Sequence, residues 1–329
     1  NLEEENLKLD RDMTYFFCNK KGYNFLELSR GEEYLDLKQD EVIDIRRWFM
    51  EQISISNKVI KEIREQKKHN INKNIFILED LFILGLRKKY NFNVLKVIFC
   101  EEKCYSEEAL DILKFYKSIC NEIYSVSSKT YDFISEKDNS AGIIAVVEID
   151  NKTFSDVYNP KYILVNDGIE LPGNLGTIYR TADAVGINLI INVDSKTNIN
   201  NSKVISSSRG MNLIIPTINC TYEEAQEYLI KNDYNIYLGE PELGTNYKDL
   251  EYIGKTVIVV GNERFGINKN WYDNKHIKVF IPMYGEMTSL NVGVAASILM
   301  YEVKHKILWY NDFRRVKWII INYLYQIYH

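Results

Sequence analysis

The sequence has few of the residues that build disulfide scaffolds and metal centres. Its five cysteines (Cys18, Cys100, Cys104, Cys120 and Cys220) are an odd number without a paired Cys-x-x-Cys spacing, and it has only four histidines. These features argue against a disulfide framework and a zinc site, so we expect free, buried thiols and no bound metal. Only 5 Pro and 16 Gly occur among 329 residues, and 46% of the residues are hydrophobic. This composition excludes wholesale disorder and predicts one or two globular domains.

Long apolar runs are also missing. The most apolar stretches, Val257–Val260 and Val316–Ile321, are far shorter than the roughly 18 residues that span a bilayer. The first residues, Asn1–Glu5, are acidic, whereas a signal peptide begins with a basic and then an apolar segment. We therefore expect a cytoplasmic protein without a membrane partner.

The net charge of −5 argues weakly against a nucleic-acid partner, because phosphates favour basic surfaces. This acidity is confined to one half of the chain. Residues 1–150 hold 23 basic and 28 acidic side chains, whereas residues 151–329 hold 18 of each. The second half is therefore neutral and compatible with local contacts to phosphate.

Hydrophobic spacing in the first half predicts an N-terminal helix followed by a small α/β domain. Apolar residues recur at near-helical spacing over Glu41–Gln66, and Lys67–Asn70 is either a linker or the solvated end of that helix. Short apolar runs then alternate with helical patterns between residues 74 and 150. We predict strands at Ile75–Leu78, Val94–Cys100 and Gly142–Ile149, and helices at Asp80–Tyr90, Ser106–Ile119 and Ser128–Ser135.

A second alternating series fills the rest of the chain, and its strands are apolar throughout. Such strands are typical of a parallel sheet that is covered on both faces. We predict strands at Tyr162–Val165, Ile187–Val193, Leu213–Ile215, Asn235–Leu238, Val257–Val260 and Ile277–Ile281, and helices at Leu175–Val185, Tyr222–Lys231 and Ser289–Leu308. The predicted domains are an N-terminal helical extension (1–70), a small α/β domain (71–152), a larger α/β domain (153–309) and a C-terminal tail (310–329).

Three segments of the larger domain share one form, an apolar strand followed at once by small and polar residues. They are Asn166–Gly186, Val260–Gly266 and Ile281–Ala296. Parallel α/β sheets bind their ligands at the edge where the strands end. Each segment alone is a weak signal, because an ordinary capped helix or a solvated turn has the same residue types.

In this order and spacing, the three segments resemble the signature motifs of the SpoU-type (TrmH-type) RNA ribose 2′-O-methyltransferases of the SPOUT superfamily. The resemblance covers about residues 160–305, and Leu171–Asn174 and Ser208–Gly210 are also similar to the thiostrepton-resistance rRNA methyltransferases of that class. It implies an α/β fold. A SPOUT domain with a parallel sheet and a deep trefoil knot, which is rare among proteins, would follow the helical extension and a small ribosomal-protein-like domain. By this resemblance, the small domain (71–152) would be the substrate-recognition domain.

The resemblance also implies the site residues and the cofactor. The catalytic positions that match the family are Asn174, Arg180, Glu263, Ser289 and Asn291. S-adenosylmethionine would be held in the knot mainly by backbone contacts at Leu238, Gly239, Gly261, Ile281, Met283 and Leu290. Backbone recognition explains why the G-x-G-x-x-G fingerprint of dinucleotide-binding folds is missing. Gly293 departs from the family pattern, in which many members carry Ser.

Local chemistry gives each motif a possible role. If a helix begins near Leu175, Asn174 is its N-cap, and the free backbone donors together with Arg180 suit a phosphate and its ribose. Glu263 follows a strand and could orient Arg180 or accept a hydroxyl hydrogen bond. Ser289 is expected to cap the last helix.

The implied reaction is in-line attack of a ribose 2′-oxygen on the methylsulfonium carbon. Because a guanidinium almost never loses its proton, we favour Arg180 as a stabiliser of the developing alkoxide over Arg180 as a base. The 2′-hydroxyl makes RNA the substrate rather than DNA. Large-subunit ribosomal RNA is the first expectation and transfer RNA the second, with a catalytically silent RNA-binding relative, or a small-molecule or protein methyltransferase, as the alternatives.

Partners follow from the same resemblance. Family members are commonly homodimers through the knotted domain, to which the aromatic tail Trp318–Tyr328 could add. Arg87, Lys88 and Lys89 are either RNA contacts or a solvated helix end. With Arg180, Arg209 and Arg264 in or near the motif loops, we expect few phosphate contacts and a shallow salt dependence, with fewer than about six released counterions.

Overall fold

The computed structural model describes residues 52–137, 140–273 and 276–308. Cys18, residues 41–51 of the predicted helix at 41–66 and the aromatic tail therefore lie outside the described residues. All described residues belong to one of the two compact units of the chain, Glu51–His329.

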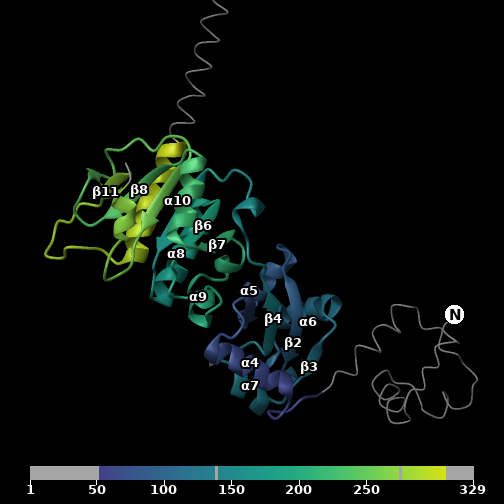
Figure 1. Ribbon diagram of the computed structural model, residues 1–329. Helices are drawn as coiled ribbons and strands as arrows, with labels where there is room; N and C mark the ends of the chain where they lie inside the picture. Colours follow the sequence, from purple (N-terminus) through teal and green to yellow (C-terminus); the bar gives the residue numbers. More distant parts are fainter. Residues whose placement is uncertain (1–51, 138–139, 274–275, 309–329) are drawn as a thin grey trace, which may run out of the picture. The chain divides into compact units, whose positions relative to one another are not determined.

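A four-stranded sheet forms the core of the first domain (Figure 1). Its order is β1-β4-β2-β3, with β4 antiparallel to both of its neighbours and β3 parallel to β2. The three predicted strands are confirmed, whereas β3 has only three residues and was not predicted. The strands are β1 (Ile75–Leu78), β2 (Asn93–Phe99), β3 (Ile123–Ser125) and β4 (Ile143–Glu148), and the helices are α4 (Lys58–His69), α5 (Leu81–Gly85), α6 (Glu107–Ile119) and α7 (Ser128–Ile134).

The helix predicted at 41–66 is confirmed from Lys58 to Gln66, whereas residues 52–57 are not helical. The backbone N–H of Ile53 donates to the carbonyl of Ser125 (3.0 Å), which ties this segment to β3. Helix α4 begins only at Lys58, where Asn57 caps it by accepting from the Val59 N–H (2.8 Å). Because α4 continues to His69, the Lys67–Asn70 segment is mostly helix and not a linker.

Helix α4 packs against α7 and β1. Its buried side chains Ile60 and Ile63 lie in the same apolar cluster as Ile77 of β1 and Ile144 of β4. The predicted domain boundary at residue 70 therefore separates α4 from the sheet against which this helix packs.

The second domain contains a seven-stranded sheet in the order β7-β6-β5-β10-β8-β11-β9, and all of its pairings are parallel. The prediction of a parallel sheet is confirmed. The strands are β5 (Tyr162–Asp167), β6 (Leu189–Val193), β7 (Thr217–Cys220), β8 (Asn235–Glu240), β9 (Thr245–Asn246), β10 (Thr256–Val260) and β11 (Ile277–Phe280).

One predicted strand, Leu213–Ile215, is wrong. Met211–Leu213 forms a 3-10 turn, and the Ile215 N–H donates to the Met211 carbonyl (3.0 Å). The apolar side chains of this segment are buried without joining the sheet, because an apolar run can fill a core as a turn as well as a strand. The edge strand β7 begins two residues later.

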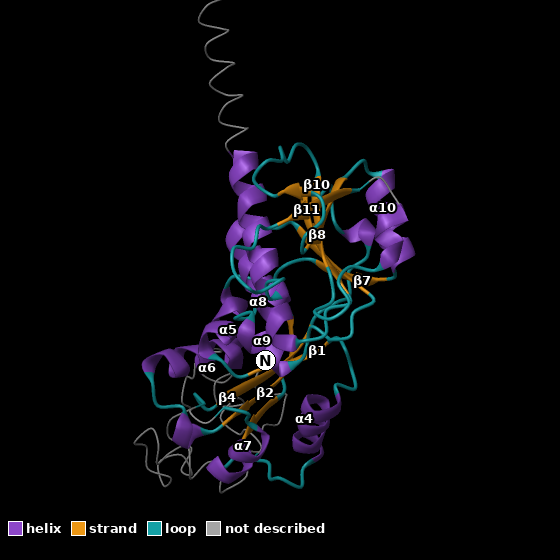
Figure 2. Cartoon of the chain, turned by 90° about the vertical axis from the view of Figure 1, so that its left-hand side faces the viewer, coloured by secondary structure: helices purple, strands orange, loops and turns teal. Residues whose placement is uncertain are grey.

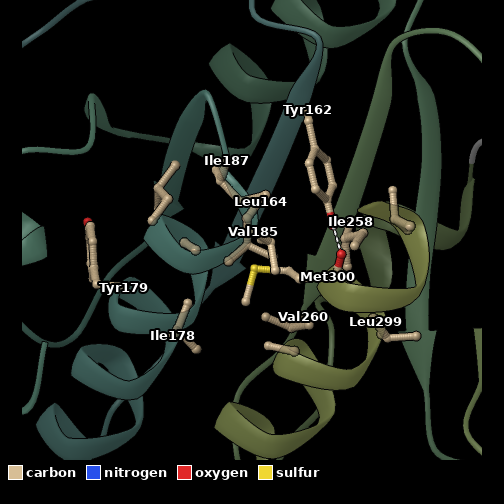
Figure 3. Close-up of a cluster of buried hydrophobic side chains, with 14 of the residues drawn as sticks. Tyr162, Leu164, Ile178, Tyr179, Val185, Ile187, Ile258, Val260, Leu299 and Met300 are labelled. Carbon is tan, nitrogen blue, oxygen red and sulfur yellow. Dashed lines mark hydrogen bonds between the residues drawn. The ribbon is translucent and has the colours of Figure 1, made fainter. Parts of the chain in front are cut away.

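Helices cover both faces of this sheet, as Figure 2 shows for α10 and α8. Helix α8 (Pro172–Val185) and a helix at 292–308 share one apolar cluster, and α10 (Tyr222–Lys231) lies in the cluster on the other face. Figure 3 shows the first cluster, in which the Tyr162 hydroxyl donates to the Met300 carbonyl (2.6 Å). This bond fixes the last helix against the first strand of the domain.

Asn200 connects the two domains through polar contacts. It is 7% exposed, and its Nδ2 donates to the backbone carbonyls of Asn72 and Ile75, both at 2.9 Å. The Nδ2 of Asn70 donates in turn to Asn200 Oδ1 (2.7 Å). The amide of Asn200 therefore holds the strand entering the small domain.

Arg209 lies at the same junction. It adopts a left-handed conformation (φ 56°), and its guanidinium lies 4.8 Å from the centre of the Phe82 ring and 3.7 Å from the Asp80 carboxylate. We expected Arg209 near the motif loops. It contacts the small domain instead.

Cys100, Cys104 and Cys120 are buried free thiols, as predicted, whereas Cys220 is a free thiol that is only half-buried. Within the described ranges, the structure contains no helix that is long and apolar enough to cross a membrane.

Candidate functional site

A cavity of about 470 Å³ lies at the carboxyl ends of β8, β10 and β11. Five of the six predicted cofactor positions line it: Gly239, Gly261, Ile281, Met283 and Leu290. The sixth, Leu238, is fully buried in the apolar cluster on one face of the sheet and does not line the cavity. We call this space the glycine cavity, because Gly239 and Gly261 contribute main chain to its lining.

Gly261 has no room for a side chain. A Cβ atom at this position would lie 2.2 Å from the carbonyl carbon of Gly266 and 2.3 Å from the nitrogen of Ile267. Such distances are impossible without moving backbone. Glycine at 261 therefore lets the loop after β10 fold back on its own strand.

Asn262, which sequence reasoning missed, holds this loop closed. Its backbone exchanges two hydrogen bonds of 2.9 Å with Gly266, and its Oδ1 accepts from the N–H groups of Arg264 (2.8 Å) and Phe265 (3.1 Å). An Asn that begins a tight turn is the local signal that could have identified it. The folded loop presents Glu263 toward the start of α8.

Glu263 accepts three hydrogen bonds from the segment that begins α8. Its Oε2 accepts from the Glu170 N–H (3.1 Å), and its Oε1 accepts from the Leu171 N–H (3.1 Å) and from Asn174 Nδ2 (2.8 Å). Burial raises the pKa of Glu263, but the bonds from Asn174 and the backbone outweigh burial and hold the pKa below its usual value. The structure thus places a carboxylate at the helix start, where we expected a phosphate, and Glu263 orients Asn174 and not Arg180.

Asn174 is not the N-cap of α8. The helix begins at Pro172 with Leu171 as the N-cap, so Asn174 is the third helical residue and its side chain is free for other contacts. Its Oδ1 accepts from Asn291 Nδ2 (3.0 Å) while its Nδ2 donates to Glu263. One amide therefore joins the second and third motifs.

Asn291, and not Ser289, caps the last helix. Asn291 Oδ1 accepts from the Gly293 N–H (3.0 Å), and the helix begins at residue 292. Ser289 is an exposed residue in the lining of the glycine cavity. The residue after the cap, Val292, also lines this cavity.

Gly293 faces α8 at close range. A Cβ atom there would lie 3.2 Å from Asn291 Oδ1 and 3.4 Å from the Cβ of Thr177. Gly293, which stands where many family members carry Ser, therefore lies where the last helix packs tightly against α8, next to the Asn291–Asn174 bond.

Arg180 lies outside the glycine cavity. It is exposed on α8, about one and a half turns after Asn174. Within the described residues, no carboxylate lies within ion-pair distance of its guanidinium. The structure therefore joins Asn174, Glu263 and Asn291 by hydrogen bonds, places Ser289 in the same cavity lining and leaves Arg180 free for an external anion.

Glu240 is a second acidic group that the sequence did not reveal. It ends β8 and lines the glycine cavity, and the Tyr272 hydroxyl donates to its Oε1. Burial and the Glu240 carboxylate raise the pKa of Tyr272, so the phenol stays a proton donor. Tyr272 comes 32 residues later in the chain, so no local pattern links the two.

Comparison with known proteins identifies the larger domain. The model of the SpoU rRNA Methylase family matches residues 161–301. The chain is 27% identical over 183 residues to the 23S rRNA (guanosine(2553)-2′-O)-methyltransferase RlmP of Bacillus subtilis, covering 56% of this chain and 73% of that protein. It is 30% identical over 217 residues to a putative TrmH family tRNA/rRNA methyltransferase of Staphylococcus aureus, covering 64% of this chain and 88% of that protein.

The fold agrees with these relatives. A crystal structure of an S-adenosylmethionine-bound rRNA methyltransferase from Sinorhizobium meliloti superposes with a TM-score of 0.69, at 22% identity, over 78% of this chain and 97% of that one. The three motifs, the parallel sheet and the relatives all indicate the same family. The chain belongs to the SpoU (TrmH) family of RNA methyltransferases, whose fold implies the trefoil knot.

Proposed function

We propose that the protein transfers a methyl group from S-adenosylmethionine to a ribose 2′-hydroxyl of structured RNA, with large-subunit ribosomal RNA as the substrate. The hydrogen-bonded set of Glu263, Asn174 and Asn291 at the rim of the glycine cavity carries this proposal. The relatives support it as well, since the protein from Bacillus subtilis is named a 23S rRNA 2′-O-methyltransferase.

The glycine cavity fits S-adenosylmethionine. Its volume is in the range of small-molecule sites. Apolar side chains of Ile281, Met283 and Leu290 suit an adenine ring, and the backbone of Gly239 and Gly261 in the lining can donate and accept hydrogen bonds. The Glu240 carboxylate at the end of β8 complements the positive charge of the cofactor.

S-adenosylmethionine supplies an activated methyl carbon, so the protein has to position the ribose and stabilise charge on its 2′-oxygen. Because its pKa is lowered, Glu263 is a poor proton acceptor, and we assign it to orient Asn174. Arg180 is exposed and unpaired within the described residues, so its guanidinium can contact the 2′-oxygen or the neighbouring phosphate. Ser289, at the exposed rim, offers a hydroxyl to the same ribose.

Homodimer formation through the larger domain is part of the proposal. The loops around the glycine cavity expose large apolar side chains, with Phe265 82% exposed, Tyr284 95% and Met287 70%. Apolar groups clustered in this way mark a protein interface. Light scattering of the purified chain tests this point, and a monomer at micromolar concentration would contradict it.

The experiment that tests the function incubates the full chain with methyl-labelled S-adenosylmethionine and unmodified transcripts of large-subunit rRNA or tRNA. We expect label in the rRNA, at a position that resists alkaline cleavage because its 2′-oxygen is blocked. A transcript with a 2′-deoxy sugar at that position should accept no label.

The other outcomes separate the alternatives. Label in tRNA alone would show that tRNA is the substrate. Label in protein or metabolite fractions instead would show that the substrate is not RNA. Cofactor binding in calorimetry without label in any RNA would indicate a silent RNA-binding relative.

A further inference from the structure

A second cavity of about 470 Å³ lies at the same edge of the large sheet, beyond β6 and β7. It is lined by the β6–α9 loop (α9, Ser202–Ser207), by residues 212–217 and by the connection at 149–153 from the small domain. Asparagine side chains recur in its lining, at Asn192, Asn198, Asn212 and Asn219, so we call it the amide cavity. None of these residues belongs to the three motifs.

Three asparagines form a hydrogen-bonded ladder across β5, β6 and β7. Asn166, Asn192 and Asn219 are register partners on these strands. Asn166 Nδ2 donates to Asn192 Oδ1 (2.9 Å), and Asn192 Nδ2 donates to Asn219 Oδ1 (3.1 Å). The first two side chains are buried, whereas Asn219 is exposed in the cavity lining. The ladder therefore fixes an amide whose Nδ2 has no partner among the described residues.

Charged groups surround this amide. Lys73 and Lys152 line the cavity from the small-domain side and are exposed, and in the described ranges neither ammonium lies within ion-pair distance of a carboxylate. Asp194 lines it from the end of β6 and adopts a left-handed conformation (φ 45°).

A chain of hydrogen bonds joins the amide cavity to the catalytic residues. The Thr197 hydroxyl, in the cavity lining, donates to the Glu170 carbonyl. The N–H of Glu170 donates to Glu263 Oε2 (3.1 Å), and Glu263 accepts from Asn174. The two cavities therefore share one segment of backbone between β5 and α8.

We propose that the amide cavity is a subsite for one unpaired nucleotide of the RNA substrate, a neighbour of the nucleotide that is methylated. This inference rests on the proposed function. A cavity of this size holds a nucleotide. Asn198, Asn219 and Asp194 offer the donors and acceptors that read a base edge, and Lys73 and Lys152 neutralise its phosphates.

The position in the sheet agrees with a neighbouring nucleotide. In the strand order β7-β6-β5-β10-β8, strand β6 is two places from β10 and three from β8, which end at the glycine cavity. With about 4.8 Å between strands, the two cavities are about 10–15 Å apart. A separate nucleotide of the same strand, and not the reacting ribose, would occupy the amide cavity.

Two variants test this subsite, Asn198→Ala/Asn219→Ala and Lys73→Gln/Lys152→Gln. The matched control is Lys129→Gln/Lys231→Gln, which removes one exposed cation from each domain away from both cavities. The measurements are the Kd for unmodified large-subunit rRNA fragments and for S-adenosylmethionine, and ultraviolet crosslinking of the full wild-type chain to the same RNA with mapping of the crosslinked peptides.

We expect each cavity variant to bind the RNA at least 10-fold more weakly than the control, with cofactor affinity unchanged and KM raised more than kcat is lowered. Crosslinks should map to the segments that line the cavity, residues 149–153, 192–199 or 212–220. Equal RNA affinity of cavity variants and control, or crosslinks confined to other segments, would overturn the subsite. If wild-type methyl transfer to RNA is intact in that case, the proposed function stands without it.

Discussion

The two cavities at the edge of one parallel sheet are built in different ways. Backbone and apolar side chains dominate the glycine cavity, where Gly239 and Gly261 contribute main chain to the lining. Polar side chains dominate the amide cavity, where a ladder through Asn192 and Asn219 fixes the outermost amide. They share the edge because all strand pairings in the sheet are parallel.

This difference determines which mutations each cavity tolerates. Main-chain donors remain after most side-chain substitutions. The glycine cavity should therefore be disrupted mainly by substitution of its glycines. Side-chain donors vanish with single substitutions, so the amide cavity can change its specificity easily. Main-chain recognition suits a cofactor that stays the same, and side-chain recognition suits an RNA substrate that varies.

The largest expected effect belongs to a residue that lies in neither cavity. Arg180→Ala should lower kcat about 100- to 1,000-fold, because a charge-stabilising contact to the 2′-oxygen is lost. The cofactor Kd should stay unchanged, since Arg180 does not line the glycine cavity. Single-turnover methyl transfer and calorimetry measure the two quantities, with Lys231→Ala as the control. Full turnover of Arg180→Ala would remove Arg180 from the mechanism.

Gly261→Ala should disrupt the glycine cavity and leave the amide cavity intact. The new Cβ would lie 2.2 Å from Gly266 backbone, so the loop that carries Glu263 must move. We expect at least a 10-fold loss of cofactor affinity and a lower melting temperature. Gly285→Ala is the matched control, because nothing lies within 4 Å of its Cβ position. Similar cofactor binding by the two variants would show that the close approach at Gly261 does not shape the cavity.

The ladder predicts unequal effects within the amide cavity. Asn192→Ala should lower the free energy of unfolding by about 1–3 kcal/mol, because the buried Nδ2 of Asn166 loses its acceptor. Asn219→Ala should cost about 0.5 kcal/mol or less, since Asn219 is exposed and Asn192 keeps its bond to the Tyr179 hydroxyl. Urea denaturation of the two variants measures the difference. Equal losses of unfolding free energy in the two variants would mean that the buried Asn166–Asn192 bond does not stabilise the core.

Glu263→Gln should have a small effect on stability, and the pH dependence of this effect distinguishes it from those of the other variants. The folded-state pKa of Glu263 lies below the ordinary value of 4.5, so its contribution is complete above pH 4.5 and is lost as the pH falls through the lowered pKa. We expect a loss of about 1 kcal/mol at pH 7, because the carboxylate is partly exposed to solvent. Wild type and variant should converge at low pH, and a constant difference down to pH 3 would contradict this account.

Local sequence signals predicted the sheet, most helices and the three motif segments, but they did not settle the details of the site. Pro172 marks the first turn of α8, and reading it as such would have placed Asn174 inside the helix. Ser289 and Asn291 are both good capping residues, and only the helix start at residue 292 decides between them.

Other features depend on contacts between distant segments. The asparagine ladder requires the register of β5, β6 and β7, which no single segment contains. Arg209 meets the small domain because it and Gly210 adopt left-handed conformations that turn the chain toward Phe82. Glu240 and Tyr272 meet only after β8 is placed in the sheet.

The junction at Asn200 has a consequence for how such enzymes diversify. Two of its three bonds go to backbone carbonyls of residues 72 and 75, which any amino acids at those positions would present. The larger domain can therefore accept a small domain of different sequence without losing these two bonds. Chimeric enzymes that exchange the segment up to residue 150 and retain Asn200 offer a route to new RNA targets on an unchanged methyl-transfer domain.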